Sequence, residues 1–227
     1  MKKAILSIII LFSLNFNVLS HVEHYAEFDY LEYELFRNDK LIGYHKYNFI
    51  RKDDILSVKS EVSFKISKLG VNLYKYYAKS EEVYKDNNFH KFSSKTNQNK
   101  KEKYVNISID KGGKELLIDG SSYKGNASID TIVGTWWNHE IVKTKAQISG
   151  ISGRVIEQTV TFIGKEDVTI NNKTYKTLRF NFKSSDETLP ESKRLNTDIW
   201  YEENTYLWVK AGFEKTGYWE YRIKKVN

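Results

Sequence analysis

The 227-residue sequence contains no cysteine and only one proline and one methionine. Without cysteine the chain can form no disulfide and has no thiol for metal binding or nucleophilic catalysis. A chain of this length buries roughly 70% of the surface that its unfolded form exposes, so it needs no disulfide to hold a core together. The one proline, Pro190, lies in the longest polar loop of the second half, residues 184–196.

The sequence also lacks the motifs and acid pairs of common enzyme classes. It has no Gly-x-Ser-x-Gly elbow and no glycine-rich phosphate loop between a strand and a helix. A glycosidase needs two acids facing one cleft, whereas adjacent strand residues face opposite sides. Four pairs of adjacent acids lie at predicted turns or strand ends, where we interpret them as solvated turn residues: Asp53-Asp54, Glu81-Glu82, Glu166-Asp167 and Glu202-Glu203. We therefore expect a protein that is not an enzyme, with no catalytic residue and no cofactor.

The first twenty residues have the composition of a signal peptide. Lys2 and Lys3 precede the apolar run 4–14, and small or neutral residues lead up to Ser20. This pattern predicts a signal peptide over residues 1–20, cleaved between Ser20 and His21, and a single β-rich domain over residues 21–227. No cysteine is present for lipid attachment, so we expect the mature protein in the periplasm or secreted, without a lipid anchor.

The net charge is +7, and removal of two leader lysines leaves 34 minus 29, or +5. The cations are mostly lysines, and they alternate with apolar residues along the chain, as on a solvated sheet face. We therefore do not expect a nucleic-acid partner.

Alternation of apolar and polar residues dominates the sequence from residue 28 onward and predicts strands joined by short turns. Strands are expected near residues 31–35, 41–51, 58–66, 73–84, 89–98, 103–110, 114–119, 154–163, 167–170, 173–182, 199–201, 206–214 and 218–225. Residues 120–145 interrupt this pattern, with a loop at 121–126 and a short helix or capping loop at 130–142. About a dozen strands predict an all-β fold in which the antiparallel sheet forms a barrel, an unclosed barrel or a sandwich.

Several segments also match a known pattern in their order along the chain. They are residues 33–43, the turn at 82–87, Thr135-Trp136-Trp137-Asn138, the turn at 163–166 and the hairpins that begin at Ile199-Trp200-Tyr201. In this order the chain resembles an uncharacterised family of exported bacterial β-rich proteins, a domain of unknown function. That family is distantly similar to the unclosed β-barrels typified by the outer-membrane lipoprotein carrier. The resemblance implies a large curved antiparallel sheet with a short helix or two, forming an unclosed β-barrel that holds a lipid or another apolar ligand.

The five histidines offer one candidate for metal binding. His45, His90 and His139 are interpreted as surface or hydrogen-bonded side chains, and Lys143 stands where a zinc-protease helix would have its second histidine. After cleavage, His21 would combine a free α-amino group with an imidazole, a pair that chelates copper, and His24 lies close by. Terminal residues bind metal weakly when mobile, so we expect no metal site, and copper binding by His21 stays an alternative.

Aromatic residues are abundant in the second half, and most of them are expected to build the core. Ligand pockets in barrels are also apolar, so some of these rings are candidates to line one. The candidate lining residues are Trp136, Trp137, Trp200 and Trp208.

These observations favour a periplasmic or exported binding or carrier protein, non-catalytic, for a lipid or apolar small molecule, with transient contact to an envelope membrane. One alternative is an integral outer-membrane β-barrel, although the terminal Lys224-Lys225-Val226-Asn227 lacks the aromatic residue with which such barrels commonly end. The others are a copper-binding envelope protein or enzyme that uses His21 and an envelope scaffold or interaction protein.

Overall fold

A computed structural model describes residues 25–227, with the side chain of Ser192 left out. The predicted signal peptide, its cleavage site at Ser20 and His21, and His24 lie outside the described residues. The described part consists of strands and short 3₁₀ helices. In chain order these are β1 (Tyr30–Arg37), β2 (Lys40–Lys52), β3 (Ile55–Lys68), β4 (Val71–Lys85), β5 (Asn88–Gln98), β6 (Lys101–Ile109), β7 (Glu115–Gly120), β8 (Lys124–Ser128), β9 (Ile132–Val133), η2 (His139–Lys143), β10 (Ala146–Ile148), β11 (Val155–Ile170), β12 (Lys173–Ser184), η3 (Glu191–Lys193), β13 (Asn196–Glu202), β14 (Trp208–Glu214) and β15 (Tyr218–Val226).

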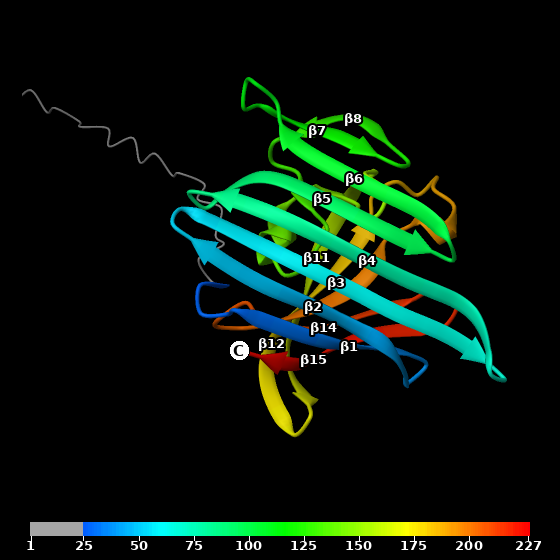
Figure 1. Cartoon of the computed structure of the whole chain (residues 1–227). Helices are drawn as coiled ribbons and strands as arrows, with labels where there is room; N and C mark the ends of the chain where they lie inside the picture. Colours follow the sequence, from blue (N-terminus) through cyan, green and yellow to red (C-terminus); the bar gives the residue numbers. More distant parts are fainter. Residues whose placement is uncertain (1–24) are drawn as a thin grey trace, which may run out of the picture.

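All fifteen strands belong to one curved sheet, which confirms the expected all-β fold (Figure 1). The order across the sheet is β8-β7-β6-β5-β4-β3-β2-β1-β15-β14-β13-β12-β11-β10-β9. Neighbours are antiparallel throughout, except that β9 runs parallel to β10. The first strand pairs with the last, so the two halves of the chain meet in the middle of the sheet.

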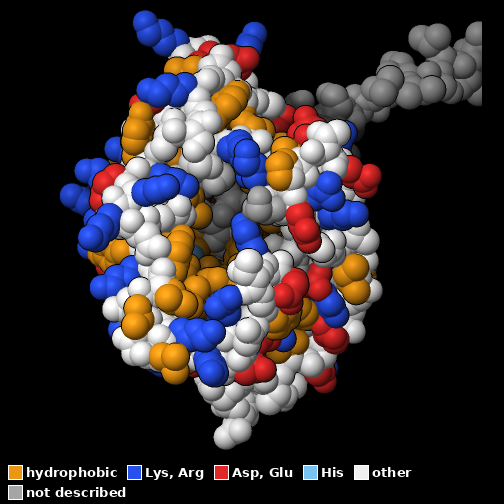
Figure 2. All heavy atoms as spheres, turned by 90° about the vertical axis from the view of Figure 1, so that its right-hand side faces the viewer, with side chains coloured by type: hydrophobic (Ala, Val, Ile, Leu, Met, Phe, Trp, Pro, Cys, Tyr) orange, Lys and Arg blue, Asp and Glu red, His pale blue; other side chains and the backbone are white. Residues whose placement is uncertain are grey.

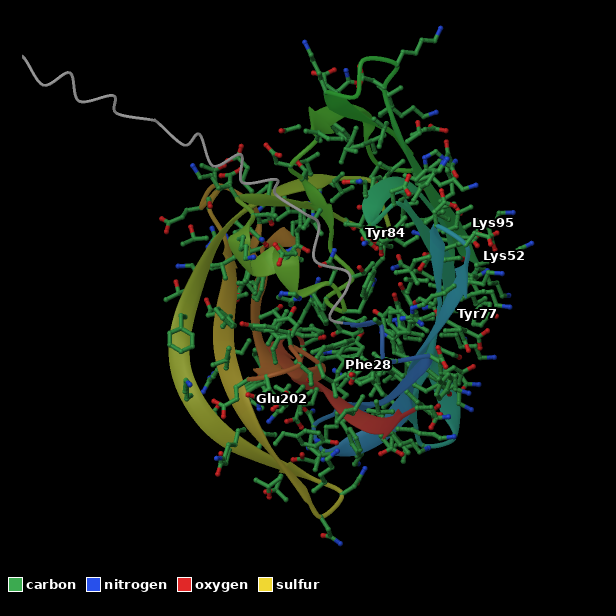
Figure 3. All side chains as sticks on the ribbon, turned by 90° about the vertical axis from the view of Figure 1, so that its left-hand side faces the viewer. Phe28, Lys52, Tyr77, Tyr84, Lys95 and Glu202 are labelled. Carbon is green, nitrogen blue, oxygen red and sulfur yellow. The ribbon has the colours of Figure 1, made fainter. Side chains whose placement is uncertain are left out.

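The sheet curves into facing walls, and each strand turns alternate side chains inward and outward. Figure 3 shows Lys52, Tyr77 and Lys95 pointing away from the molecule, whereas Phe28 and Tyr84 point into it. This alternation explains why the periodicity of the sequence located most strands. Charged residues take the outward positions because water solvates them there, and apolar residues take the inward ones.

Two-residue turns of one conformation join three of the hairpins. Asn38-Asp39, Asp86-Asn87 and Asn171-Asn172 all have positive φ, between 48° and 64°. This is the backbone of a tight hairpin turn, and Asn and Asp tolerate it better than most residues. The predictions of turns at 38–39 and 171–172 are confirmed, and the predicted turn at 82–87 narrows to its last residues because β4 continues to Lys85.

The structure corrects two predictions of local structure. The expected turn at residues 163–166 lies inside the sixteen-residue strand β11, where the register with β12 shifts between Phe162 and Gly164. This irregularity bends the strand without ending it. In the segment 120–145, short strands β8 and β9 form where a loop was expected, and only residues 139–143 are helical.

The main core fills one end of the curved sheet. Trp137 is fully buried there, and its ring makes edge-to-face contacts with Tyr25, Phe49 and Tyr84 at centroid distances of 5.4 to 5.7 Å. A second cluster of apolar residues packs beneath β5, β6 and β7: Phe92, Val105, Ile107, Leu116, Ile118, Val133 and Ile148.

The two ends of the sheet approach each other without pairing strand to strand, so the barrel is unclosed. The turn between β10 and β11 lies against β5, where the Ser94 hydroxyl donates to the carbonyl oxygen of Gly150. It also lies against the β7–β8 turn, where the backbone N–H of Ser122 donates to the carbonyl oxygen of Ser152 at 3.0 Å. A Cβ atom on Gly120 would stand 2.7 Å from the carbonyl oxygen of Ser152. Glycine at position 120 therefore permits this close approach.

Candidate ligand-binding hollow

Small side chains occupy the inner face of the sheet where strands β3, β4 and β5 run side by side. The register places Ser60 opposite Ser80 and Ser80 opposite Ser94, so three serines form a row across three strands. The neighbouring row contains Ala78, which lies opposite Thr96 on β5. Because these side chains are short, they do not fill the space in front of the sheet.

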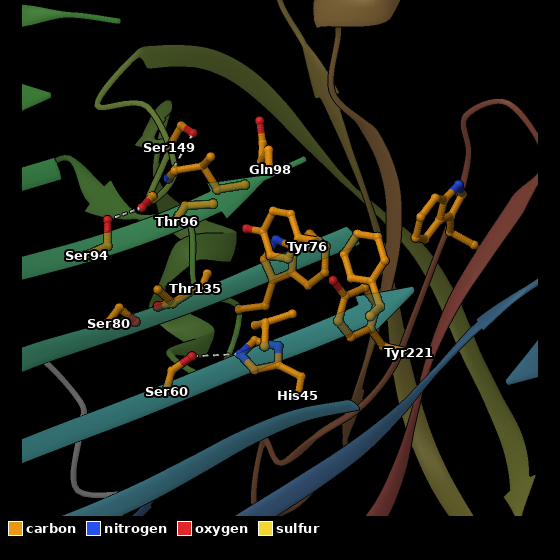
Figure 4. A pocket seen from close by; sticks show the side chains of 18 of the residues that line it. His45, Ser60, Tyr76, Ser80, Ser94, Thr96, Gln98, Thr135, Ser149 and Tyr221 are labelled. Carbon is orange, nitrogen blue, oxygen red and sulfur yellow. Dashed lines mark hydrogen bonds between the residues drawn. The ribbon is translucent and has the colours of Figure 1, made fainter. Parts of the chain in front are cut away.

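The space is a cavity of about 790 Å³, which we call the hollow (Figure 4). Its volume lies within the range of small-molecule sites, about 300 to 1,000 Å³. Rings from both halves of the sheet and from the segment between β9 and η2 form its walls: Phe64, Tyr74, Tyr76, Phe92, Trp136, Phe213, Trp219 and Tyr221. The serine row contributes hydroxyl groups to a mostly apolar lining.

The hollow opens at the end of the sheet away from the main core. Figure 2 shows the opening from outside, with apolar side chains within it and charged side chains, Lys and Arg as well as Asp and Glu, on the surface around it. We call this opening the mouth. It is formed by the β3–β4 hairpin, the β14–β15 turn and the segment around η3, which contribute Ile66, Leu73, Lys193, Leu195, Lys215 and Thr216 to the lining.

His45 lies in the wall of the hollow. Its Nε2 atom is 2.9 Å from the hydroxyl oxygen of Ser60, so the interpretation as a hydrogen-bonded histidine fits its position. Burial lowers the pKa of His45 from 6.5 to about 3 because the charged imidazole would lose its hydration. The imidazole is therefore neutral at physiological pH, and this part of the wall carries no charge.

The other described histidines lie outside the hollow. His90 is exposed on β5. His139 is buried in η2, where its ring stacks on Tyr206 at 4.4 Å and its Nε2 lies 3.1 Å from Glu140. Among residues 25–227, no group of three or more His, Asp or Glu side chains is placed to hold a metal ion.

A buried carboxylate, Glu82, anchors the segment between the hollow and the main core. Its side chain is 2% exposed and accepts hydrogen bonds from Trp137 Nε1 at 3.0 Å, from Thr135 Oγ1 at 3.1 Å and from the Tyr84 hydroxyl. Burial raises the pKa of Glu82, although the hydrogen bonds of Tyr84, Trp137 and Thr135 oppose that shift. The sequence interpretation of Glu82 as a solvated turn residue is wrong, because position 82 faces inward on β4.

The four tryptophans proposed as lining residues take different positions. Trp136 lines the hollow. Trp137 belongs to the main core, and Trp208 lies beneath the hollow, fully buried and stacked on Tyr33 at 4.0 Å. Trp200 faces the outer side of β13, between Arg179 and Lys210, which lie over its ring at 4.9 and 4.8 Å. It points outward because Ile199 and Tyr201, its neighbours in the strand, point inward.

The row of serines in the hollow was not anticipated from the sequence. Serine and alanine at alternate positions of a strand resemble the polar face of any solvated sheet. Their meaning appears only when the register places Ser60, Ser80 and Ser94 side by side on the inner face. A signal was nevertheless present in β5, where Phe92, Ser94 and Thr96 share one face and Lys91, Ser93 and Lys95 share the other.

None of the helices among residues 25–227 is long and apolar enough to span a membrane.

The fold of this chain is similar to that of a protein of known structure. The structure is similar to the crystal structure of a β-barrel-like protein of the domain of unknown function DUF1849 from Brucella abortus, with a TM-score of 0.60 and 10% sequence identity. The similarity covers 87% of this chain and 96% of that one. A DUF1329 family protein from Desulfovibrio piger ATCC 29098 also matches, at 9% identity over 87% of this chain and 84% of that one, but its TM-score of 0.25 supports no argument. No curated protein matches the sequence.

The family model of the domain of unknown function DUF6134 matches residues 33–224, and the chain therefore belongs to this family. The expectation of a β-rich family of unknown function is confirmed. At 10% identity, the likeness to the DUF1849 protein shows a shared fold alone.

Proposed function

We propose that this protein is a non-catalytic binding or carrier module that holds the apolar chain of a lipid or similar molecule inside its curved sheet. One observation carries the proposal: the curved sheet surrounds a hollow of about 790 Å³ with walls of aromatic and aliphatic side chains. Apolar surface of this kind is stabilised when a ligand replaces water in contact with it. The proposed location, periplasmic or secreted, rests on the sequence of the first twenty residues.

The chemistry of the lining supports binding of a flexible chain over recognition of a polar molecule. The serine row supplies neutral hydroxyls, and the buried His45 is uncharged at neutral pH. A polar ligand buried here would exchange its hydration for contact with a mostly apolar wall, which is unfavourable. An apolar chain has no hydrogen bonds to lose.

The outer face of the sheet supports a binding module over an integral outer-membrane barrel. Outward positions of β3 and β4 carry ion pairs, with Lys79 3.4 Å from Glu61 and Lys59 4.0 Å from Glu81. A strand that faces lipid presents apolar residues at these positions, since Lys at the bilayer midplane costs about 2 to 4 kcal/mol. The copper alternative concerns His21, which lies outside the described residues.

The experiment replaces one small inward residue by a large one. Ser80→Phe adds a ring inside the hollow, and Ser93→Phe adds the same ring to the outer face of the neighbouring strand. Each protein is purified, offered dodecanoate, separated from free ligand and extracted with organic solvent, and the retained chain is quantified by mass spectrometry. We expect about one equivalent in the original protein and in Ser93→Phe, and a loss of about tenfold or more in Ser80→Phe, because the ring occupies the chain's space.

Circular dichroism and thermal unfolding of both variants control for folding. Because the added ring enters a space that is not filled by side chains, Ser80→Phe is expected to fold as stably as the original protein. Equal retention by the two variants, or no retention by the original protein, would contradict the proposal.

A further inference from the structure

The charged residues that line the hollow have one sign. The lining includes Arg37, Arg154, Lys193, Arg194 and Lys215, together with Lys79, and no Asp or Glu among the described lining residues. The whole chain has 29 acidic and 36 basic residues, so a lining with this many cations would ordinarily include several acids as well. The lining is therefore far more positive than the chain as a whole.

Most of these cations are not neutralised within the protein. Lys79 pairs with Glu61 on the outer face, and Arg194 donates to the carbonyl oxygens of Glu187 and Leu189 within its own loop. The other four, Arg37, Arg154, Lys193 and Lys215, form no ion pair with a residue that the structure describes. Their charges remain available to a ligand, and each lies at the opening.

Arg37 and Arg154 are held in place by backbone oxygens. The guanidinium of Arg37 donates to the carbonyl oxygen of Thr216 and lies 5.8 Å from the ring centre of Trp219. Its Nε atom is buried and has no hydrogen-bond partner in the described structure. Arg154 donates to the backbone carbonyl oxygen of Lys193 at 3.4 Å, which places its guanidinium beside η3. Arg37 thus lies beside the β14–β15 turn, which carries Lys215, and Arg154 lies beside η3, which carries Lys193.

We propose that the ligand of the hollow is an anionic amphiphile, whose chain enters the hollow and whose carboxylate or phosphate group stays at the mouth between these cations. The inference rests on the function proposed above and adds the chemical class and the orientation of the ligand. The neutral inner wall fixes the orientation. An anion placed beside His45 and the serine row would be dehydrated without a countercharge, whereas an anion at the mouth keeps part of its hydration and meets Arg and Lys.

The test compares ligands that share one chain and differ in the headgroup. Nile red, a neutral apolar dye, is bound to the purified protein and displaced by dodecanoate, dodecyl phosphate, 1-dodecanol or dodecyltrimethylammonium. We expect the two anions to displace the dye at lower concentration than the alcohol, and the cation to be weakest. Inorganic phosphate and acetate, which have no chain, are expected not to displace it. Raising the salt concentration from 0.1 to 1 M should weaken only the anions, because it shortens the screening length from about 10 to 3 Å.

Two double variants that remove the same number of charges test whether the preference for anionic headgroups comes from the mouth. Arg154→Gln with Lys215→Gln removes two charges at the mouth, and Lys91→Gln with Lys95→Gln removes two from the outer face of β5. The mouth variant should bind dodecanoate about 2- to 30-fold more weakly, because two exposed ion pairs with the carboxylate are lost, and should bind 1-dodecanol unchanged. The outer variant should bind both as the original protein does.

Failure of the headgroup inference and failure of the proposed binding function would give different results. Equal displacement by dodecanoate and 1-dodecanol, or an equal loss in both double variants, overturns the headgroup inference and leaves the binding function standing. Displacement by inorganic phosphate alone overturns it as well, because the chain would then play no part. If neither the dye nor any of the four amphiphiles binds, the proposed function itself fails.

Discussion

His45 is the residue whose chemistry the fold changes most clearly. Its imidazole is enclosed by the rings of Tyr33, Tyr47, Trp208 and Tyr221 at centroid distances of 4.3 to 6.3 Å, and its one hydrogen bond goes to Ser60. The unfolded chain can protonate this histidine near pH 6.5, but the folded protein resists protonation until about pH 3. Above pH 6.5 His45 is neutral in both the folded and the unfolded chain, so its titration costs no stability. Below pH 6.5 the unfolded chain binds a proton that the folded protein does not, and the free energy of unfolding falls.

This linkage gives a prediction for His45→Asn. As pH falls from 6.5 towards 3, the unfolded state of the original protein takes up a proton that the folded state refuses, so it loses up to about 1.4 kcal/mol per pH unit. The asparagine variant has no such titration. Urea unfolding at pH 7.5 and pH 4.5 should therefore show the original protein losing about 2 to 3 kcal/mol relative to the variant. A difference in unfolding free energy that stays constant with pH would show that His45 is not held neutral.

Glu82 shows where residue types alone mislead. Next to Glu81 and ahead of the true turn at Asp86-Asn87, it looked like one of several solvated acids. The strand continues past it, and its inward position makes it the common acceptor for Thr135 and Trp137. Glu81 and Glu82 are adjacent in β4, so they point to opposite faces of the sheet, one to the surface and one to the core. The sequence alone did not show that the strand extends past both residues.

Among the elements, β2 combines pairing on both sides with a local irregularity. The register of β1 with β2 shifts between Leu35 and Phe36, close to Gly43. A Cβ atom at Gly43 would stand 2.0 Å from the carbonyl oxygen of Ser63 and 2.5 Å from the Cβ of Phe64. Neither of these atoms is the end of a flexible side chain, so the strands themselves would have to separate.

Gly43→Ala should therefore cost about 3 kcal/mol of unfolding free energy, at the upper end for overpacking. Gly70→Ala is the matched control, because Gly70 has a φ of +78° but no atom within 4 Å of an added Cβ. It should cost only about 1 kcal/mol, the strain of the left-handed conformation. Urea unfolding measures both. Equal losses would mean that the close approach of β2 and β3 at Gly43 is not as described.

The strands could be predicted well where one face is buried and the other solvated, because apolar and polar residues then alternate along the sequence. Prediction failed where that contrast is weak. Gly164 interrupts the pattern of β11 and was interpreted as part of a turn, but it accommodates an irregularity in a continuous strand. Strands β8 and β9 are short and largely lack alternating apolar residues, so composition alone suggested a loop.

At the scale of the whole molecule, the curved, unclosed sheet followed from the strand count and the family resemblance, but the hollow did not. Its position depends on register, which brings Ser60, Ser80 and Ser94 into one row. The position of the hollow also depends on how far the main core extends. Side chains of the main core cover one end of the inner face, whereas the hollow lies in front of the other end. Of the four tryptophans, only Trp136 lines the hollow. Trp137 and Trp208 are buried in the main core, and Trp200 lies on the outer face of its strand.

The most direct test of the central claim is a crystal structure of the protein after incubation with dodecanoate. We predict continuous density for the chain inside the hollow, along the serine row and beside Tyr76 and Tyr221, with the carboxylate towards the mouth. Side chains collapsed into that space, or a chain bound on the outer face while the hollow holds only water, would contradict the account.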